Sequence, residues 1–501
     1  MVDNNSKNKR ILGVVVFAVY FVMLLGTLVV VYYDPFFHFH GPIEGERYII
    51  HNQAYQNPGI ARNFDYDSLI VGSSMTELLF PSLFDKEYGC RAVKTPYSGG
   101  SIKNANIILQ QAFSHHKGKI EYVFWGLDPY AFNIDVDQVK QELPQYLYND
   151  SILDDMSYLN NKEVLKYIVE NWKNGETIDY DTMYDNIGKE MFCQQAALSY
   201  VDDEKYENIT GENLKSRELE PDKEIVDNIS QNVTPIVSGN PNTKFIFFIP
   251  PYPIIHWLNY DADSLSQLVC NIDYIYKELS KSSNTELHML QLMGNTDNLY
   301  MYKDNYHYSF RMSEDISGAL KSREYELNAD NVEEQLERFY SYVQCYDYSI
   351  YSGERYSFQK EINLAEYLDA TYQSDIVRIA IVSENIGNLN YEEIKALKNY
   401  GLLDESYAGG NSVVVARDDD TIRNRLTEVL SSAGAHTKVV NKEFIINCSS
   451  EDGMTATSCM CDGIEYIAEP KLLMIVAIDA NTGRVVDVAG LREDTRELVK
   501  Y

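Results

Sequence analysis

Two patterns of apolar positions alternate along the first two thirds of the chain. Short runs that are apolar at nearly every position are typical of strands buried on both faces of a parallel sheet. Longer segments between them carry apolar residues at helical spacing. Strand and helix in alternation predict an α/β domain with a mostly parallel sheet. The expected strands are 67–72, 122–127, 244–250 and 286–292, and the expected helices are 104–116, 160–172 and 264–281.

A second pattern begins after the polar, helical segment 326–347, which we take as a domain boundary. This divides the globular part into a first domain, 65–345, and a second domain, 346–501. In the second domain strands and helices are mixed with a hairpin, so we expect a smaller α+β unit. Its expected strands are 375–384 and 409–418, its expected helices are 390–402 and 419–434, and its expected hairpin is 471–490, with the turn at 481–483.

One N-terminal segment is apolar on all sides. Residues 11–33 carry no charge and exceed the roughly 20 residues that span a bilayer. Lys7, Lys9 and Arg10 precede them, which favours a cytoplasmic tail at 1–10 and an extracytoplasmic location for all that follows. A cleaved signal peptide is the alternative, but it would have a shorter apolar region and a small-residue cleavage site. We expect residues 34–64 to form a stalk and the entry into the first domain.

Composition excludes some partners. Asp and Glu outnumber Lys and Arg by 75 to 43, for a net charge of −32, which argues against nucleic acid as a ligand. Seven cysteines leave at least one unpaired. Three of them, Cys448, Cys459 and Cys461, lie in a stretch that we expect to be a loop, and no His lies there to complete a zinc site. A disulfide or free thiols are the remaining alternatives, and we expect no metal and no cofactor.

The candidate chemistry lies at strand ends. Ser73 and Ser74 follow the first strand, where a hydroxyl can either cap the next helix or point into a crevice. Asp304 and His307 follow the last expected strand of the first domain. A serine, a histidine and an aspartate together supply a nucleophile, a base and a group that orients the base.

Other residues near strand ends add possible contacts to a ligand. Gly99 and Gly100 form a loop in which the backbone can approach a ligand closely. Asp128 directly follows the second expected strand. Trp257 follows a proline-rich break, where it either stacks on a sugar or simply packs in the protein.

These motifs and their order resemble the SGNH/GDSL hydrolase superfamily, in particular its membrane-anchored branch of teichoic-acid D-alanylation and alginate O-acetylation proteins. In that branch an anchor precedes a Gly-Ser-Ser motif, matched here by residues 72–74, and a C-terminal Asp-x-x-His motif, matched by residues 304–307. The resemblance covers about residues 35–345.

The resemblance implies a three-layer α/β/α domain in which Ser74 is the nucleophile, His307 the base and Asp304 its orienting group. Gly99 or Gly100 would donate to the oxyanion. The superfamily's third motif is Gly-x-Asn-Asp, and its Asn also donates to the oxyanion, whereas this chain has Asp128 there. An ionised Asp only accepts hydrogen bonds. Three alternatives follow: Asp128 is protonated, it binds a substrate hydroxyl, or backbone N–H groups alone form the oxyanion hole.

The second domain resembles the interleukin-like EMT inducer family, through the strand, helix and Gly-rich turn of 375–418 and the hairpin of 471–490. In that family the hairpin usually precedes the helix, whereas here it comes last. The resemblance implies a carbohydrate-binding or protein-contacting role; the alternative is a structural appendage.

Three functional hypotheses result. The first is a membrane-anchored extracytoplasmic serine esterase or O-acyltransferase that acts on acylated cell-envelope glycans. The second is a non-catalytic surface protein that binds carbohydrate or protein through a degenerate SGNH-like domain. The third is a scaffold within an acylation complex whose partner is a membrane acyltransferase.

Overall fold

The computed structural model describes most of the chain. The described residues are 2–140, 142–184, 194–199, 214, 219–351, 363–373, 375–382, 389–403, 413–418, 426–430, 435–440, 442–451, 454–461, 464–467, 473–492 and 495–500.

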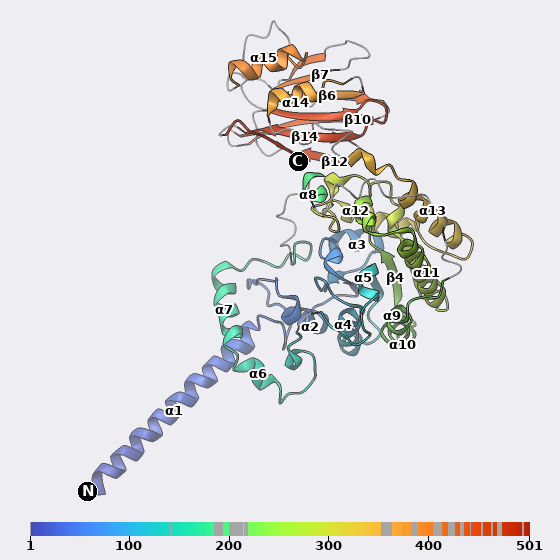
Figure 1. Cartoon of the computed structure of the whole chain (residues 1–501). Helices are drawn as coiled ribbons and strands as arrows, with labels where there is room; N and C mark the ends of the chain where they lie inside the picture. The colour runs from blue at the N-terminus through green and yellow to red at the C-terminus, as the bar shows by residue number, and fades with distance from the viewer. Residues whose placement is uncertain are drawn as a thin grey trace.

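A long N-terminal helix, α1 (Val2–Tyr33), projects from the body of the molecule (Figure 1). Between Arg10 and Tyr33 it is long and apolar enough to cross a membrane. A membrane anchor and a signal sequence share this length and composition.

Five parallel strands form the sheet of the first domain in the order β2-β1-β3-β4-β5. Strands β1, β3 and β4 lie within the runs expected from the apolar pattern, and β5 overlaps its expected run 286–292 but starts one residue earlier and ends at Met289. The predicted parallel sheet is therefore confirmed. Strand β2 is only three residues long, and its apolar run was too short to stand out. The strands are β1 (Ser68–Val71), β2 (Ala92–Lys94), β3 (Tyr122–Gly126), β4 (Lys244–Ile249) and β5 (Thr285–Met289).

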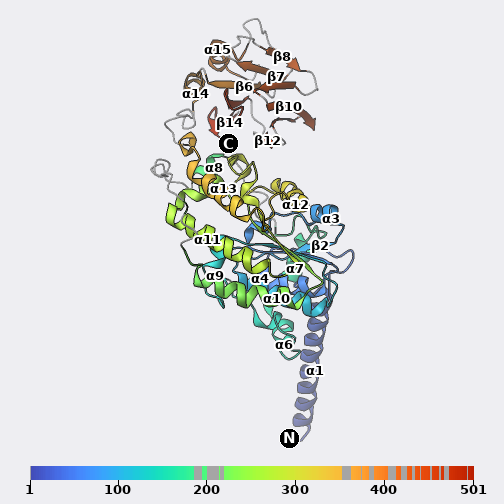
Figure 2. The same ribbon diagram turned by 90° about the vertical axis from the view of Figure 1, so that its right-hand side faces the viewer.

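Helices cover both faces of this sheet. Figure 2 shows α4 (Ile102–His115), α10 (Thr234–Gly239) and α11 (Ala262–Leu279) on one side, and α3 (Pro81–Tyr88) and α12 (Met312–Ser322) on the other. The α/β/α layering follows from parallel strands, because each crossover must place its helix on one face. Beside these layers lie α2 (Gln53–Asn63), α5 (Pro129–Phe132), α9 (Lys223–Asn228) and α13 (Val332–Cys345).

The strand order places a crevice at one end of the sheet. The chain runs from β1 outward to β2 and then returns to add β3 on the other side of β1. Loops that leave two such neighbouring strands diverge, and ligands of open α/β sheets bind at the crevice between them. Ser73 and Ser74 follow β1, and Asp128 follows β3, so these side chains flank the switch point.

The C-terminal region contains two antiparallel sheets. One has the order β15-β14-β13-β6-β7-β8 and the other β12-β11-β10-β9. Two helices pack on one face of the larger sheet, namely α14 (Leu364–Ala370) and α15 (Tyr391–Asn399). The smaller sheet packs on the other face. The strands are β6 (Ile376–Val382), β7 (Val413–Asp418), β8 (Leu426–Leu430), β9 (Ala435–Val439), β10 (Lys442–Glu451), β11 (Met454–Cys461), β12 (Ile464–Ile467), β13 (Leu473–Asp479), β14 (Val485–Leu491) and β15 (Leu498–Lys500).

The expected hairpin of this region is confirmed, because β13 pairs with β14 and Gly483 has the positive φ of +70° that a tight turn requires. Two local predictions were wrong. The segment 419–434 was expected to be a helix, but its described part is strand β8, which pairs with β7. Residues 419–425 and 431–434 lie outside the described residues. The cysteine-bearing segment expected as a loop is the β10–β11 hairpin, in which Cys459 and Cys461 are buried free thiols.

The two parts of the chain meet through the segment that follows α13 and through the loop after β5. Helix α13 packs in the core of the first domain, which extends through Tyr351. The segment predicted as a stalk is also tied to this core, because α2 buries Ile60 and Ala61 in it. Arg484, from the β13–β14 turn, donates hydrogen bonds to Asp297 and to the hydroxyl of Tyr346.

Candidate active site

Ser74 and His307 lie within hydrogen-bond distance, although 233 positions separate them in the sequence. The distance from Ser74 Oγ to His307 Nε2 is 2.8 Å. Ser74 begins the short 3-10 helix 74–76 immediately after β1, and Ser73 caps it by accepting the Met75 N–H. The turn between strand and helix requires glycine at position 72, since its φ is +153° and a Cβ there would lie 2.7 Å from the Thr76 side chain. Gly72 and the Ser73 cap therefore shape the turn on which Ser74 lies.

Asp304 orients the histidine. Its Oδ2 lies 2.8 Å from His307 Nδ1, and its Oδ1 accepts the N–H groups of Tyr306 and His307, each at 2.7 Å. These contacts leave Nε2 for the serine hydroxyl. Burial alone would raise the pKa of Asp304, but the hydrogen bonds and charge of His307 outweigh it and lower the pKa below its ordinary value. Asp304 is therefore an ionised partner for His307.

Asp128 is a second carboxyl group at the same end of the sheet. Its surroundings shift its pKa in the direction opposite to that of Asp304. Its side chain is only 1% exposed. It accepts a hydrogen bond from the Tyr252 hydroxyl and is hydrogen-bonded to the Ser73 side chain. Burial raises the pKa of Asp128, and these hydrogen bonds and the charge of His307 offset the rise only in part. A neutral carboxyl group can donate a hydrogen bond, which an ionised one cannot.

Gly99 and Gly100 differ in exposure and in backbone conformation. The Gly100 N–H donates to the Tyr97 carbonyl at 2.7 Å, and a Cβ on Gly100 would lie 2.6 Å from Tyr97 Cβ. Gly100 is thus needed for a tight turn that already uses its N–H. Gly99, with a φ of +64°, is exposed.

A buried network behind this loop was missed by the sequence analysis. The Glu77 side chain accepts hydrogen bonds from Gln53 and from the Ser98 hydroxyl, and Gln53 in turn accepts the Ser98 N–H at 2.7 Å. Burial raises the pKa of Glu77, although these hydrogen bonds and the charges of His307 and Lys94 oppose the rise. The only sequence signal was the position of Glu77, three residues after Ser74, on the same short helical segment.

Trp257 lies in the core and offers no face to a ligand. It is fully buried, with its ring against Phe339 at a centroid distance of 5.1 Å. Its neighbour His256 is also buried, which lowers the pKa of that imidazole to about 4. The exposed aromatic ring at this place is Tyr306, which is 39% exposed and lies 4.8 Å from the His256 ring. Tyr306 precedes His307 directly, and its exposed ring lies 6.4 Å from the His307 ring.

The arrangement contains the groups that nucleophilic catalysis uses. It holds a hydroxyl, an imidazole and a carboxylate in a hydrogen-bonded row, beside a buried carboxyl group that is held toward its neutral form. Among the described residues no group of three His, Cys, Asp or Glu side chains is placed to hold a metal ion. In comparisons with known proteins, no family model and no curated protein matches the sequence.

Proposed function

We propose that this chain is a membrane-anchored serine esterase or O-acyltransferase of the SGNH type. It acts outside the cytoplasm, with α1 as the anchor, on acyl groups of cell-envelope glycans. The observation that carries the proposal is the row Ser74–His307–Asp304, in which both side-chain distances are 2.8 Å. A hydroxyl and an imidazole that merely stabilised the fold would not need an ionised carboxylate behind the imidazole.

In the proposed reaction Ser74 Oγ attacks the carbonyl carbon of an acyl ester while His307 Nε2 takes the hydroxyl proton. The ionised Asp304 stabilises the imidazolium that forms. Collapse of the tetrahedral intermediate breaks the bond to the leaving alcohol, which receives the proton from His307, and leaves the acyl group on Ser74. Water or a sugar hydroxyl then attacks the acyl-enzyme by the same steps in reverse.

The oxyanion needs donors in the tetrahedral intermediate. We assign this role to the backbone at Ser74, to the exposed Gly99, and to the neutral carboxyl group of Asp128 in place of the family's Asn. One such donor contributes on the order of 100- to 1000-fold to the rate. The raised pKa of Asp128 supports this assignment, because it favours the protonated form that can donate.

Labelling with a fluorophosphonate tests the proposal, since the probe reacts only with an activated serine. The full-length chain in membranes should become labelled, and Ser74→Ala should abolish the label. Ser73→Ala should retain it, as should the matched control Ser322→Ala, an exposed serine at the end of α12. Absence of labelling in the folded wild-type chain, or labelling that persists in Ser74→Ala, would contradict the proposal and favour a binding protein.

Co-purification addresses the proposed partner. If the chain receives its acyl group from a membrane acyltransferase, it should be isolated from membranes together with that enzyme. Hydrolysis of a simple acetyl ester by the chain alone would show that the partner is not needed for the chemistry.

A further inference from the structure

Exposed apolar side chains gather on one segment outside α1. Among the described residues beyond α1, six of the ten large apolar side chains that are exposed lie between positions 152 and 172. Three of them are among the most exposed: Ile152 at 82%, Leu153 at 85% and Trp172 at 77%. The six are Ile152, Leu153, Met156, Leu165, Val169 and Trp172. We call these residues the apolar patch.

On α7 (Lys162–Asn174) the patch forms a stripe. Leu165, Val169 and Trp172 recur at i, i+4 and i+7, so they share one face of the helix. Val164 and Ile168 lie on the adjoining face and are buried in a cluster that includes Val30 of α1. The helix therefore has an apolar face turned into the protein and a second apolar face turned outward.

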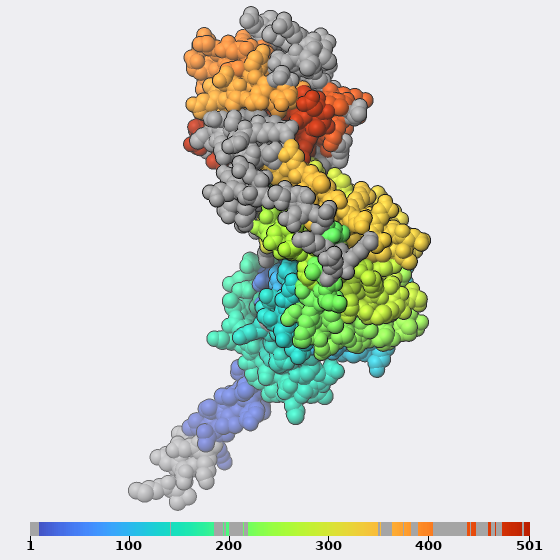
Figure 3. Space-filling view, turned by 45° about the vertical axis from the view of Figure 1, so that its right-hand side comes forward, coloured from blue at the N-terminus to red at the C-terminus, as the bar shows by residue number. Residues whose placement is uncertain are grey.

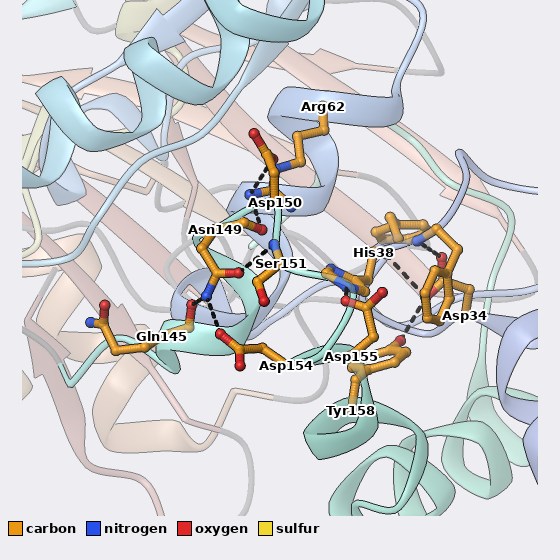
Figure 4. A network of polar contacts seen from close by, with 12 residues as sticks. Asp34, His38, Arg62, Gln145, Asn149, Asp150, Ser151, Asp154, Asp155 and Tyr158 are labelled. Atoms are coloured by element: carbon orange, nitrogen blue, oxygen red, sulfur yellow. Dashed lines mark hydrogen bonds and ion pairs between the residues drawn. The ribbon is translucent and has the colours of Figure 1, made fainter.

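The segment that carries the remaining patch residues is held close to the end of α1 by buried and partly buried polar contacts. Asp34, the first residue after α1, accepts a hydrogen bond from the hydroxyl of Tyr158 at 2.6 Å. Four residues later, His38 Nε2 lies 2.7 Å from Asp155 Oδ1. Both partners belong to α6 (Asp155–Leu159), which directly follows Ile152 and Leu153 (Figure 4). Arg62 of α2 ties the preceding chain down by donating to the Asn149 carbonyl at 3.1 Å.

The position of the patch along α1 matches a bilayer surface. The 24 residues from Arg10 to Tyr33 span about 36 Å at about 1.5 Å per residue, and the hydrocarbon core is about 30 Å thick. Val30 lies about 30 Å beyond Arg10 on this scale, and α7 packs against it. Figure 1 shows α6 and α7 flanking this end of α1, and Figure 3 shows the surface of the same part of the chain directly where α1 leaves the body.

We propose that the apolar patch inserts into the lipid interface beside α1, so that the first domain lies on the membrane and is not held away from it by a stalk. The proposal rests on the anchoring role of α1 in the proposed function. The position and composition of the patch favour lipid as its occupant, because the patch begins at the expected bilayer boundary and contains a Trp, a residue enriched at membrane interfaces. Lys162, Lys166 and Lys173 lie on the same helix, where their ammonium groups can reach lipid phosphates.

The three Trp residues of the chain make the contact measurable. Trp125 and Trp257 are fully buried, and α1 contains none, so only Trp172 is open to a quencher in the lipid. The full-length chain is reconstituted into vesicles of phosphatidylcholine, with or without bromine on the acyl carbons nearest the headgroup. Brominated lipid should reduce the Trp emission by up to about one third, since Trp172 is one of three. Trp172→Phe should remove this quenching.

A matched control places a Trp at an exposed site far from α1. In the Trp172→Phe background, Tyr391→Trp adds an indole to α15, where the native side chain is 74% exposed. Its emission should be quenched by iodide from the water and unaffected by brominated lipid.

The outcomes separate the two proposals. If the chain floats with the vesicles but Trp172 responds only to iodide, α1 is an anchor, the apolar patch faces water, and the lipid-contact proposal is wrong. If the chain does not float with the vesicles, the anchoring proposal is wrong and the lipid contact with it. Quenching of Trp172 by the brominated lipid supports both.

Discussion

Replacing Asp128 by Asn tests the electrostatics of the proposed oxyanion site. The amide has nearly the shape of the carboxyl group, its oxygen can still accept the Tyr252 hydroxyl, and its NH₂ group donates at any pH. The change therefore removes a titration and keeps the packing. We expect the variant to retain acyl-ester hydrolysis, and to become more stable than the wild type as the pH rises.

The size of this difference in stability follows from the linkage between proton binding and folding. An unfolded Asp loses its proton above a pKa of about 3.9, whereas burial raises the pKa of Asp128 in the folded chain. The folded state then binds more protons than the unfolded state between those two pKa values. Stability is accordingly full below the unfolded pKa and falls as the pH rises, by about 1.4 kcal/mol per pH unit, until the folded pKa is reached. Between pH 5 and pH 7 the advantage of Asp128→Asn should grow by up to about 2.7 kcal/mol.

Equilibrium unfolding of the solubilised chain, followed through the emission of the buried Trp125 and Trp257, measures this difference at pH 5, 6 and 7. Asp330→Asn is the control, since that aspartate is exposed. Its effect should not change with pH. The activity of the wild type should also fall as the pH rises through the pKa of Asp128, and that of Asp128→Asn should not. A stability advantage that stays flat from pH 5 to pH 7 would show that Asp128 is ionised throughout, and would remove it from the proposed oxyanion hole.

Other substitutions probe single contacts. Asp304→Asn removes the carboxylate that orients His307, so kcat for an acetyl ester should fall by about 10³- to 10⁴-fold with little change in folding. Ser98→Ala removes a donor to Glu77 and loosens the glycine loop; kcat should fall on the order of 10-fold while KM changes little, and equal losses of folded protein and activity would contradict a positioning role. Arg484→Met removes the donor shared by Asp297 and Tyr346, and should lower the free energy of unfolding by about 1–3 kcal/mol. Limited proteolysis between the two parts of the chain should then be faster, while labelling of Ser74 stays unchanged.

Much of the first domain was predictable because its signals are local. Strands β3 and β4 are buried on both faces, so each reads as a continuous apolar run. The parallel order of the sheet then places strand ends at one edge, which is why residues following β1 and β5 could be expected to meet. The second domain was harder. Strand β8 lies in a segment whose apolar spacing suits a helix, and only its ladder with β7 decides otherwise.

Neither the burial of Trp257 nor the role of Glu77 could be read from the sequence. A Trp after a proline-rich break is equally compatible with a sugar platform and with the core, and its contact with Phe339 of a distant helix decides between them. Glu77 acquires its place only when α2 brings Gln53 and the β2 loop brings Ser98 to the same carboxylate. Such contacts join segments that no sequence spacing relates.

The two aspartates of the site show why residue type alone could not settle the chemistry. Asp304 and Asp128 are both largely buried near His307, yet the pKa of the first is lowered and that of the second is raised. Asp304 receives two backbone N–H groups and the imidazole, which stabilise its charge. Asp128 receives two hydroxyl groups, too little to offset its burial. Carboxyl groups whose pKa values are pushed apart in this way can serve as a charged stabiliser and a neutral donor in one site. An Asp at the position where the SGNH superfamily, which the chain resembles, has Asn is therefore compatible with the proposed oxyanion hole, because its burial favours the protonated form.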